Sequence, residues 1–466
     1  MLSSRDRLLV GLFVAQLAAA LIFGVVLVNG LNDAGDGRQV VLDESGEPGA
    51  AAGGVVTEPG AEGEPGTAGG GPQAGTGDEP GGTPGTAAPG APAAPGGPRA
   101  GARTGVTDTT IKIGTLVTQT GAINFKSSAQ ATRAYVDLVN EQGGVHGRKI
   151  ELMLRDDGLD ANRGQAAVQE MLNAGVFAFV GFNAPLTEQS IVPVLMRNKI
   201  DLYGSFNAPG TERSYIFSGP YTTFGFIGAS HLATQGVKTP GIVFISNQNE
   251  EADNNIRKGF RDGFASKGLT LRDDNIHAVD VTKASYDDVV TQLRLNGVDG
   301  IGTLLESTGM VRLQQSMNRA GYKPKHMASP FGGDPSVLRH PQVGASFEGT
   351  FVISDVEFLE GGSPAVGEYI QQVRRRYGGQ ADLNWAGQHG WLAAKVFVEA
   401  LRRAGRDLTR EHLMATLRTF RDWQNGFTTP MTITPRTNPG AVNICAKIGK
   451  VANGKVVQVR DWECHA

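Results

Sequence analysis

Short apolar runs alternate with amphipathic helical segments along the chain from residue 110 to residue 320. The runs that we predict as strands are 111–117, 149–154, 176–180, 242–245, 269–279 and 301–305. Apolar residues recur with helical spacing in 127–140, 162–172, 187–197, 254–264, 286–295 and 311–320. Strands that alternate with helices form parallel sheets covered by helices on both faces. The alternation therefore predicts an α/β fold.

Glycines mark one of the joints in this pattern. Gly143, Gly144 and Gly147 separate the helical segment 127–140 from the apolar run 149–154. Glycine adopts left-handed backbone angles without a Cβ penalty, so it can end the helix and turn the chain into a strand. A break near Phe217–Ser–Gly–Pro–Tyr221 divides the whole alternation into two series. Two series in about 360 residues predict two α/β lobes.

The predicted strands end in polar, glycine-containing loops. These loops are Thr118–Ala122, Gly181–Pro185, Gly204–Ala208, Ser246–Asn249 and Glu306–Gly309. Ligands of open α/β sheets bind beyond the carboxyl ends of the strands, so the set predicts a shared cleft. The alternative for each single loop is a structural one, in which its polar side chain caps the following helix.

The N-terminal fifth of the chain differs from the rest in composition. Residues 31–105 contain 22 glycines and 10 prolines and almost no large apolar side chain. Such a segment cannot bury enough surface to offset its ordering entropy, so we predict a disordered tether. It carries ten acidic residues and three arginines, which leaves 106–466 close to neutral. A near-neutral module gives no electrostatic reason to expect nucleic-acid binding.

A membrane segment is predicted at 8–28, where Gln16 is the one polar residue. An apolar helix of this length can span a bilayer. Arg5 and Arg7 precede it, and Asp33 and Asp36 follow, so the positive-inside rule places the rest of the chain outside the cytoplasm. We therefore expect an anchor at 1–30. The alternative is a cleaved signal peptide, although its apolar core is usually shorter.

The two cysteines, Cys445 and Cys464, are expected to form a disulfide because the chain is exported. Asn453–Gly454 predicts a hairpin turn between them. With that turn, Cys445 lies opposite Trp462, two residues from Cys464. The disulfide therefore requires a bulge or a curled strand end.

No enzyme motif was found in the sequence. Gly-x-Ser-x-Gly, Gly-x-x-x-x-Gly-Lys-Ser/Thr and His-Glu-x-x-His do not occur, and the eight histidines lack metal-ligand spacing. We therefore expect no catalysis, cofactor or metal.

Several segments of the chain resemble those of a known family. The segments "IKIGTLVTQTG", "VNEQGG" and "VHGRKIELMLRDDGLD" are similar to the start of type I periplasmic solute-binding proteins, and later segments such as "FVGFNAP" and "GIVFISNQNEEADNNIRKGFRDGF" follow in the family's order. These proteins form the branched-chain amino-acid/amide-binding family that serves ATP-binding-cassette (ABC) importers. The resemblance implies two lobes joined by three crossover strands, near 217–224, 351–358 and 427–433. Lobe one would be 106–221 with 355–426, and lobe two would be 222–354 with 427–466.

The resemblance also implies a ligand site between the lobes. The predicted ligand-binding residues are Thr120, Asn124, Phe125, Asn183, Ala184, Ser205, Phe206, Asn207, Asp253, Glu306, Ser307 and Phe331. Phe125, Phe206 and Phe331 of this set, with Trp385 and Trp391, are candidates for an aromatic wall, and the protein core is the alternative for each. Asp334 is a further candidate partner for an ammonium.

Three departures from the family pattern bear on the ligand. Amino-acid binders of the family hold the carboxylate with a serine and loop amides, where this chain has Asn183, Ala184 and Pro185. They hold the ammonium with a tyrosine and a glutamate, where this chain has Ala252 and the neighbourhood of Phe331. We therefore expect a small organic ligand with one polar or carbonyl end and an apolar or aromatic body, and weak binding of leucine. The amides of Asn183, Ala184 and Ser205 are expected to hold its oxygen.

Two functions fit these expectations. The first is an extracytoplasmic binding protein that delivers its solute to ABC permease subunits. The second is a ligand-sensing ectodomain that acts through a separate membrane partner, because the few residues before the membrane segment leave no room for a signalling domain.

Overall fold

A computed structural model describes residues 103–465, except 186, 205–212, 216, 218, 247–249 and 435–442. The chain divides into two compact units, Met1–Gly90 and Ala91–Ala466, and all described residues belong to the second. The predicted membrane segment and nearly all of the predicted tether lie outside the described residues. Within the described part of the chain, no helix has the length and apolar character needed to cross a membrane.

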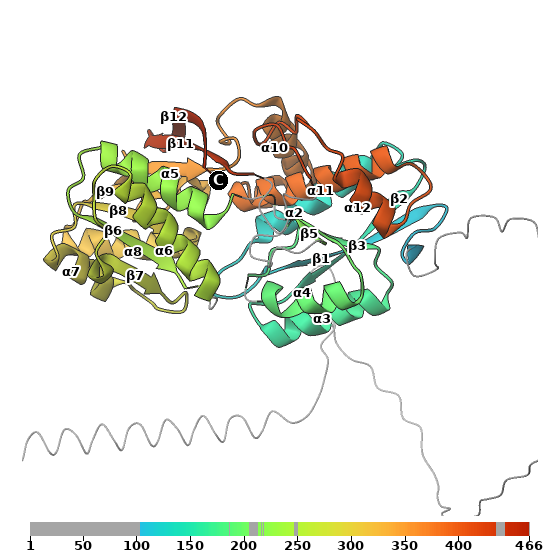
Figure 1. Cartoon of the computed structure of the whole chain (residues 1–466), viewed down its shortest axis with the longest axis horizontal. Coiled ribbons are helices and arrows are strands. Elements are labelled where there is room, and N and C mark those ends of the chain that lie inside the picture. Colours follow the sequence, from blue (N-terminus) through green and yellow to red (C-terminus); the bar gives the residue numbers. More distant parts are fainter. Residues whose placement is uncertain are drawn as a thin grey trace, which may run out of the picture. The chain divides into compact units, whose positions relative to one another are not determined.

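The first lobe is built on a parallel sheet with the strand order β2-β1-β3-β4-β5. Its strands are β1 (Thr110–Val117), β2 (Lys149–Asp156), β3 (Ala178–Val180), β4 (Leu202–Tyr203) and β5 (Ser214–Tyr215). Its helices are α2 (Lys126–Glu141), α3 (Ala161–Asn173), α4 (Glu188–Arg197), α10 (Pro364–Tyr377), α11 (Trp385–Ala404) and α12 (Arg410–Leu417). Figure 1 shows α3 and α4 on one side of this sheet and α2 and α11 on the other.

The second lobe is built on a seven-stranded sheet with the order β12-β11-β10-β9-β8-β6-β7. Its strands are β6 (Pro240–Ile245), β7 (Ile276–Val279), β8 (Gly300–Leu304), β9 (Lys325–Ala328), β10 (Phe351–Ser354), β11 (Cys445–Ala452) and β12 (Lys455–Cys464). Its α-helices are α5 (Tyr221–Thr234), α6 (Glu250–Ala265), α7 (Asp287–Leu295), α8 (Ser307–Ala320) and α9 (Pro335–Leu338). Two buried clusters cover its two faces, one with α5 and α6 and one with α7 and α8. The predicted two-lobed α/β fold is thereby confirmed.

The predicted glycine joint follows α2. Gly143, Gly144 and Gly147 all have positive φ angles, of 102°, 81° and 79°. The N–H of Gly144 donates to the Val139 carbonyl at the end of the helix, 2.9 Å away. A Cβ at Gly144 would lie 2.0 Å from the carbonyl oxygen of Arg148, so no other residue fits there without moving the backbone. Close backbone approach, together with positive φ, explains the glycines.

Three expectations about the elements need correction. The predicted connection 217–224 is shorter than expected because α5 begins at Tyr221. Of the predicted strand 269–279, Ile276–Val279 forms strand β7, preceded by a 3₁₀ turn at Asp273–Asn275. The sheet of the second lobe is parallel from β10 to β7, but β11 and β12 pair antiparallel, since a hairpin at the chain's end needs no crossover helix.

The predicted third connection, 427–433, packs with the first lobe. Phe427, Met431 and Ile433 are buried in the same cluster as Trp391. The chain next appears at residue 443 and enters β11 at Cys445. Apolar packing therefore holds 427–433 in the first lobe, whereas the sequence had assigned it to the start of the second.

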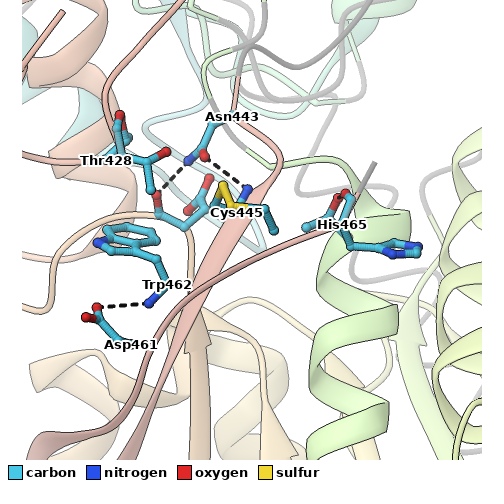
Figure 2. Close-up of a disulfide and its surroundings, with 10 residues drawn as sticks. Thr428, Asn443, Cys445, Asp461, Trp462 and His465 are labelled. Atoms are coloured by element: carbon cyan, nitrogen blue, oxygen red, sulfur yellow. Dashed lines mark hydrogen bonds between the residues drawn. A yellow bond between two sulfur atoms is a disulfide. The ribbon is translucent and has the colours of Figure 1, made fainter. Parts of the chain in front are cut away.

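The predicted disulfide between Cys445 and Cys464 is present and joins the ends of β11 and β12 (Figure 2). Pairing runs without a shift from Ala452 opposite Lys455 to Gly449 opposite Gln458. Two register shifts follow, and beyond them Cys445 lies opposite Cys464. Each shift places one extra residue in β12, as β-bulges do. Together the shifts supply the two-residue offset that the sequence required.

Candidate functional site

A cavity of about 90 Å³ lies between the two lobes, at the carboxyl ends of their strands. It is lined by Ile123, Phe125, Asn183, Pro185, Gly219, Tyr221, Phe224, Ile245, Leu304, Leu305, Glu306, Ser329, Pro330, Phe331 and Trp385. Open α/β sheets place their ligand sites at this position because the loops that leave the strands converge there. Most of the lining residues are apolar or aromatic, as is usual for pockets that hold small organic molecules.

Three aromatic rings connect the lobes at the cavity. Phe331 of the second lobe lies between two rings of the first lobe, with ring centroids 6.1 Å from Phe125 and 5.0 Å from Trp385. Phe331 and Trp385 meet edge to face, the arrangement favoured by the ring quadrupoles. Val281 of the second lobe packs against the same first-lobe cluster. These contacts bring the second lobe against the first beside the cavity.

The first-lobe wall is held rigidly by backbone hydrogen bonds at the end of β1. The N–H of Asn183 donates to the carbonyl of Leu116, and the carbonyl of Asn183 accepts from the N–H of Thr118, both at 2.9 Å. The carbonyl of Thr118 in turn accepts from the N–H of Phe125 at 2.7 Å. Asn183 and Phe125 are therefore positioned by one strand end.

The side chain of Asn183 has an unused donor. The residue is 1% exposed, and its Nδ2 has no hydrogen-bond partner among the described residues. A buried amide nitrogen without a hydrogen-bond partner costs about 1–3 kcal/mol.

Glu306 forms the polar wall on the second lobe. It is 7% exposed and caps α8, where its carboxylate accepts from the N–H groups of Thr308 and Gly309. Burial raises the pKa of Glu306. Burial also raises the pKa of Asp334, which accepts from the Ser307 hydroxyl at 2.6 Å, and the pKa of Asp382. Among the described residues that line the cavity, Glu306 is the one acid.

One buried carboxylate, Asp355, ties the cavity to the connections between the lobes. It directly follows β10, and its Oδ2 accepts from the N–H of Gly219 at 2.5 Å. Its Oδ1 accepts from the indole N–H of Trp385 at 2.7 Å and lies 3.2 Å from Nε2 of His389. Its backbone carbonyl accepts from the side chain of Asn443 at 2.7 Å, next to the disulfide (Figure 2).

Asp355 and two of its partners, Gly219 and Asn443, lie on the three segments that pass between the lobes. Gly219 precedes α5, Asp355 itself follows β10, and Asn443 precedes β11. Gly219 and Trp385 also line the cavity. Asp355 therefore links the cavity wall to all three connections through direct hydrogen bonds.

The structure brings four of the predicted ligand-binding residues to the cavity and leaves five elsewhere. Phe125, Asn183, Glu306 and Phe331 line it, as does Trp385 from the wider set, whereas Trp391 lies fully buried in the core of the first lobe. Four of the other predicted residues have partners within their own lobe: Thr120 donates to Asp156, Asn124 accepts from the N–H of Lys126, Ser246 donates to Asp253, and Ser307 donates to Asp334. Ala184 is fully buried. Ser205, Phe206 and Asn207 lie outside the described residues.

The expected oxygen-binding role of two backbone amides is wrong. The N–H of Asn183 donates to the carbonyl of Leu116, and the N–H of Ala184 donates to the side chain of Glu188 at 3.1 Å. Glu188 lies in the first turn of α4, and its carboxylate thus accepts a hydrogen bond from the loop that precedes this helix. Asn183 lines the cavity, and its side-chain Nδ2 is buried without a hydrogen-bond partner among the described residues.

Sequence reasoning missed the part of the wall that comes from α5 and the loop before it. Gly219, Tyr221 and Phe224 line the cavity. The glycine and proline before Tyr221 are also a helix-start signal, because proline is favoured at the beginning of a helix and cannot continue a preceding strand. Among the described residues, no group of three or more His, Cys, Asp or Glu side chains can hold a metal ion.

Comparison with known proteins agrees with this architecture. A family model described as periplasmic binding protein matches residues 110–455. A fatty acid ABC transporter substrate-binding protein from Thermomonospora curvata is similar in structure, with 23% identity, a TM-score of 0.68, and coverage of 78% of this chain and 94% of the other. A substrate-binding periplasmic protein from Ralstonia solanacearum has 20% identity, a TM-score of 0.66 and coverage of 75% and 100%.

A third similar structure holds a ligand. It is a solute-binding protein of an ABC transporter from Rhodopseudomonas palustris HaA2 in complex with p-hydroxybenzoic acid, with 15% identity, a TM-score of 0.63 and coverage of 76% and 97%. At these identities the likeness shows the fold. No curated protein matches the chain. The family match over most of the chain confirms the resemblance seen in the sequence, and the protein belongs to the periplasmic binding protein family.

Proposed function

We propose that this protein is an extracytoplasmic binding protein that encloses a small organic solute between its two lobes and delivers it to the permease subunits of an ABC importer. The observation that carries this proposal is the apolar cavity at the strand ends, where Phe331 of the second lobe lies between Phe125 and Trp385 of the first. Ligand contacts to both lobes favour the closed form, which an importer can distinguish from the open form.

The similar structures support a role in solute uptake. Their names describe binding proteins of ABC transporters, including one for fatty acids and one in complex with p-hydroxybenzoic acid. A thermal-shift screen of the full-length protein against amino acids, amides, aromatic acids and polyamines tests the proposal. A ligand at 100 times its dissociation constant stabilises the protein by about 2.7 kcal/mol. Absence of any stabilising solute, together with unchanged uptake in a deletion strain, would contradict it.

Branched-chain amino acids are expected to bind weakly. The cavity wall holds the capped Glu306, and none of its described lining residues is a cation that could pair with a carboxylate. Desolvating the two charges of leucine without full compensation costs several kcal/mol per ion. We expect dissociation constants above ~100 μM for leucine, isoleucine and valine, measured by calorimetry. Submicromolar leucine binding would show that the ligand class is wrong.

Membrane attachment through 1–30 is part of the proposal. It rests on the apolar sequence at 8–28 and its flanking charges. N-terminal sequencing of the protein from native membranes should give the uncleaved start, and alkaline extraction should leave it in the membrane pellet. A chain lacking 1–30 but carrying a foreign signal peptide is the control and should be released. A mature N-terminus near residue 32 would instead show a secreted protein.

A further inference from the structure

The two lobes meet along a seam that begins at the cavity. From the second lobe, Phe331 lines the cavity and Pro335 lines a neighbouring groove of about 800 Å³. From the first lobe, Trp385 lines the same cavity and Asp382 lines the same groove. The two short segments therefore face each other across the seam. Asp334 lies on the second-lobe side, between Phe331 and Pro335.

The carboxyl group of Asp334 is buried at this seam. The residue is 2% exposed, and its Oδ2 accepts from the hydroxyl of Ser307, 2.6 Å away in the same lobe. The backbone N–H of Trp385, the first residue of α11, acts on the carboxyl from the other lobe as a hydrogen-bond donor. Both donors favour the charged form of Asp334. The state of this carboxyl therefore depends on groups from both lobes.

Burial and two neighbouring acids oppose that charge. Burial is the largest effect on Asp334 and raises its pKa, and repulsion by Asp382 and Glu306 raises the pKa further. Asp382 precedes α11 in the first lobe, and Glu306 precedes α8 in the second. The net result is a pKa well above the ordinary value, which is about 4 for an exposed aspartate. At this seam Asp334 therefore keeps its proton at pH values at which an exposed aspartate has lost it.

The basic side chains of this region act on the other acids. Burial raises the pKa of each of those acids, and a basic side chain partly offsets it: Lys126 acts on Asp382, Arg312 on Glu306, and Arg339 on Glu360 at the groove. Arg374 also lines the groove. Within the described part of the chain, no basic side chain is among the groups that act most strongly on Asp334.

Opening of the lobes reverses the balance at Asp334. Asp382 and Trp385 move away with the first lobe, water reaches the carboxyl, and hydration lowers its pKa toward the ordinary value. Between the two pKa values the closed form binds one proton more than the open form. The advantage of the closed form is therefore fully present below the pKa of the open form, and it is lost as the pH rises through the pKa of the closed form.

We propose that Asp334 is a proton-dependent latch between the lobes, so that acidification favours the closed, solute-holding form. This inference rests on the lobe closure of the proposed function and adds a regulation to it. Asp334 is a positioning residue, because it does not line the cavity and acts through its neighbour across the seam, Trp385, which does.

The distance between the lobes, measured in the full-length protein without added solute, tests the inference. Gln165→Cys on α3 and Lys267→Cys just after α6 place one spin label on each lobe, at exposed positions. The two native cysteines are joined to each other, so the introduced cysteines alone react with the label. Electron–electron distance measurements then give the ratio of open to closed molecules. We expect this ratio to rise at least about ten-fold from pH 5 to pH 8, since one proton changes it by up to ten-fold per pH unit.

Three variants in the labelled background separate the proton from the hydrogen bonds. Asp334→Asn resembles the protonated acid and keeps an acceptor, so it should stay mostly closed and change less than about two-fold over this pH range. Asp334→Ala lacks the acceptor and should be more open than Asp334→Asn at both pH values. Asp262→Asn is the matched control, because Asp262 is exposed on α6 and lines neither the cavity nor the groove. It should respond to pH as the wild type does.

Three outcomes would overturn the inference. They are a wild-type distance distribution that does not change with pH, a wild-type pH response that persists in Asp334→Asn, and a response that is lost equally in Asp262→Asn. Each would leave the proposed function standing, because lobes can close on a solute without taking up a proton. The proposed function is decided separately, by the solute screen and the uptake assay.

Discussion

Replacing Asp355 with alanine is expected to lower the free energy of unfolding by about 3–5 kcal/mol, as happens when one partner of a buried polar network is removed. The wild-type carboxylate accepts from the N–H of Gly219 and the indole N–H of Trp385, and lies beside His389. Alanine removes the acceptor of these groups where water does not reach them. Urea denaturation of the variant and the wild type measures the difference.

The same substitution is expected to weaken solute binding, because Gly219 and Trp385 form part of the cavity wall. Asp355→Asn keeps one oxygen and should fall between the wild type and alanine in both measurements. Asp461→Ala is the matched control: Asp461 is exposed on β12 and accepts from the N–H of the neighbouring Trp462, so its loss should cost less than about 0.5 kcal/mol. A stability of Asp355→Ala within 1 kcal/mol of wild type would contradict this account, because the threshold is about the contribution of a single hydrogen bond.

Removing the disulfide by replacing Cys445 and Cys464 together with alanine should cost about 3 kcal/mol of unfolding free energy in the chain-entropy model. The bridge closes a loop between cysteines separated by 19 positions. It also holds the chain end against α5, where the ring of His465 stacks on Phe226 and its carbonyl accepts from the Thr223 hydroxyl. Denaturation with and without a thiol reductant measures the loss.

The reductant provides the internal control for the disulfide. It should destabilise the wild type to the level of the double variant and leave the double variant unchanged. Two free thiols in protein taken from its native compartment, or a wild type insensitive to the reductant, would refute the stabilising role.

The place of the site followed from the sequence because it depends on local patterns. Alternating strands and helices require parallel sheets, and parallel sheets bring their carboxyl ends to one edge. Loop residues directly after those strands, such as Asn183 and Glu306, were therefore predicted and do line the cavity. The hairpin offset between Cys445 and Cys464 was equally local, since it followed from the position of Asn453–Gly454.

The hydrogen-bond partner of each polar group could not be predicted from the sequence. Some partners are distant in the chain, and others are nearby groups that compete for the same donor. Thr120 was a candidate ligand contact, yet Asp156 holds it from the neighbouring strand, 36 positions away. The N–H of Ala184 was expected to be free, yet Glu188 folds back to it. A pattern of residue types does not state which of several acceptors a donor will reach.

The sequence by itself determined the two-lobed α/β class, the strand ends at which a solute would be held, and the disulfide with its required bulge, because periodicity and turn chemistry act over a few residues. Tertiary structure alone decided that Asp355 joins the three connections, since Gly219 is 136 positions before it and Asn443 is 88 positions after it. It also decided that the side-chain nitrogen of Asn183 is left without a partner among the described residues, because that depends on every group packed around it. Which buried polar groups find a hydrogen-bond partner depends on the complete fold, whereas short stretches of the sequence determine the strands and helices.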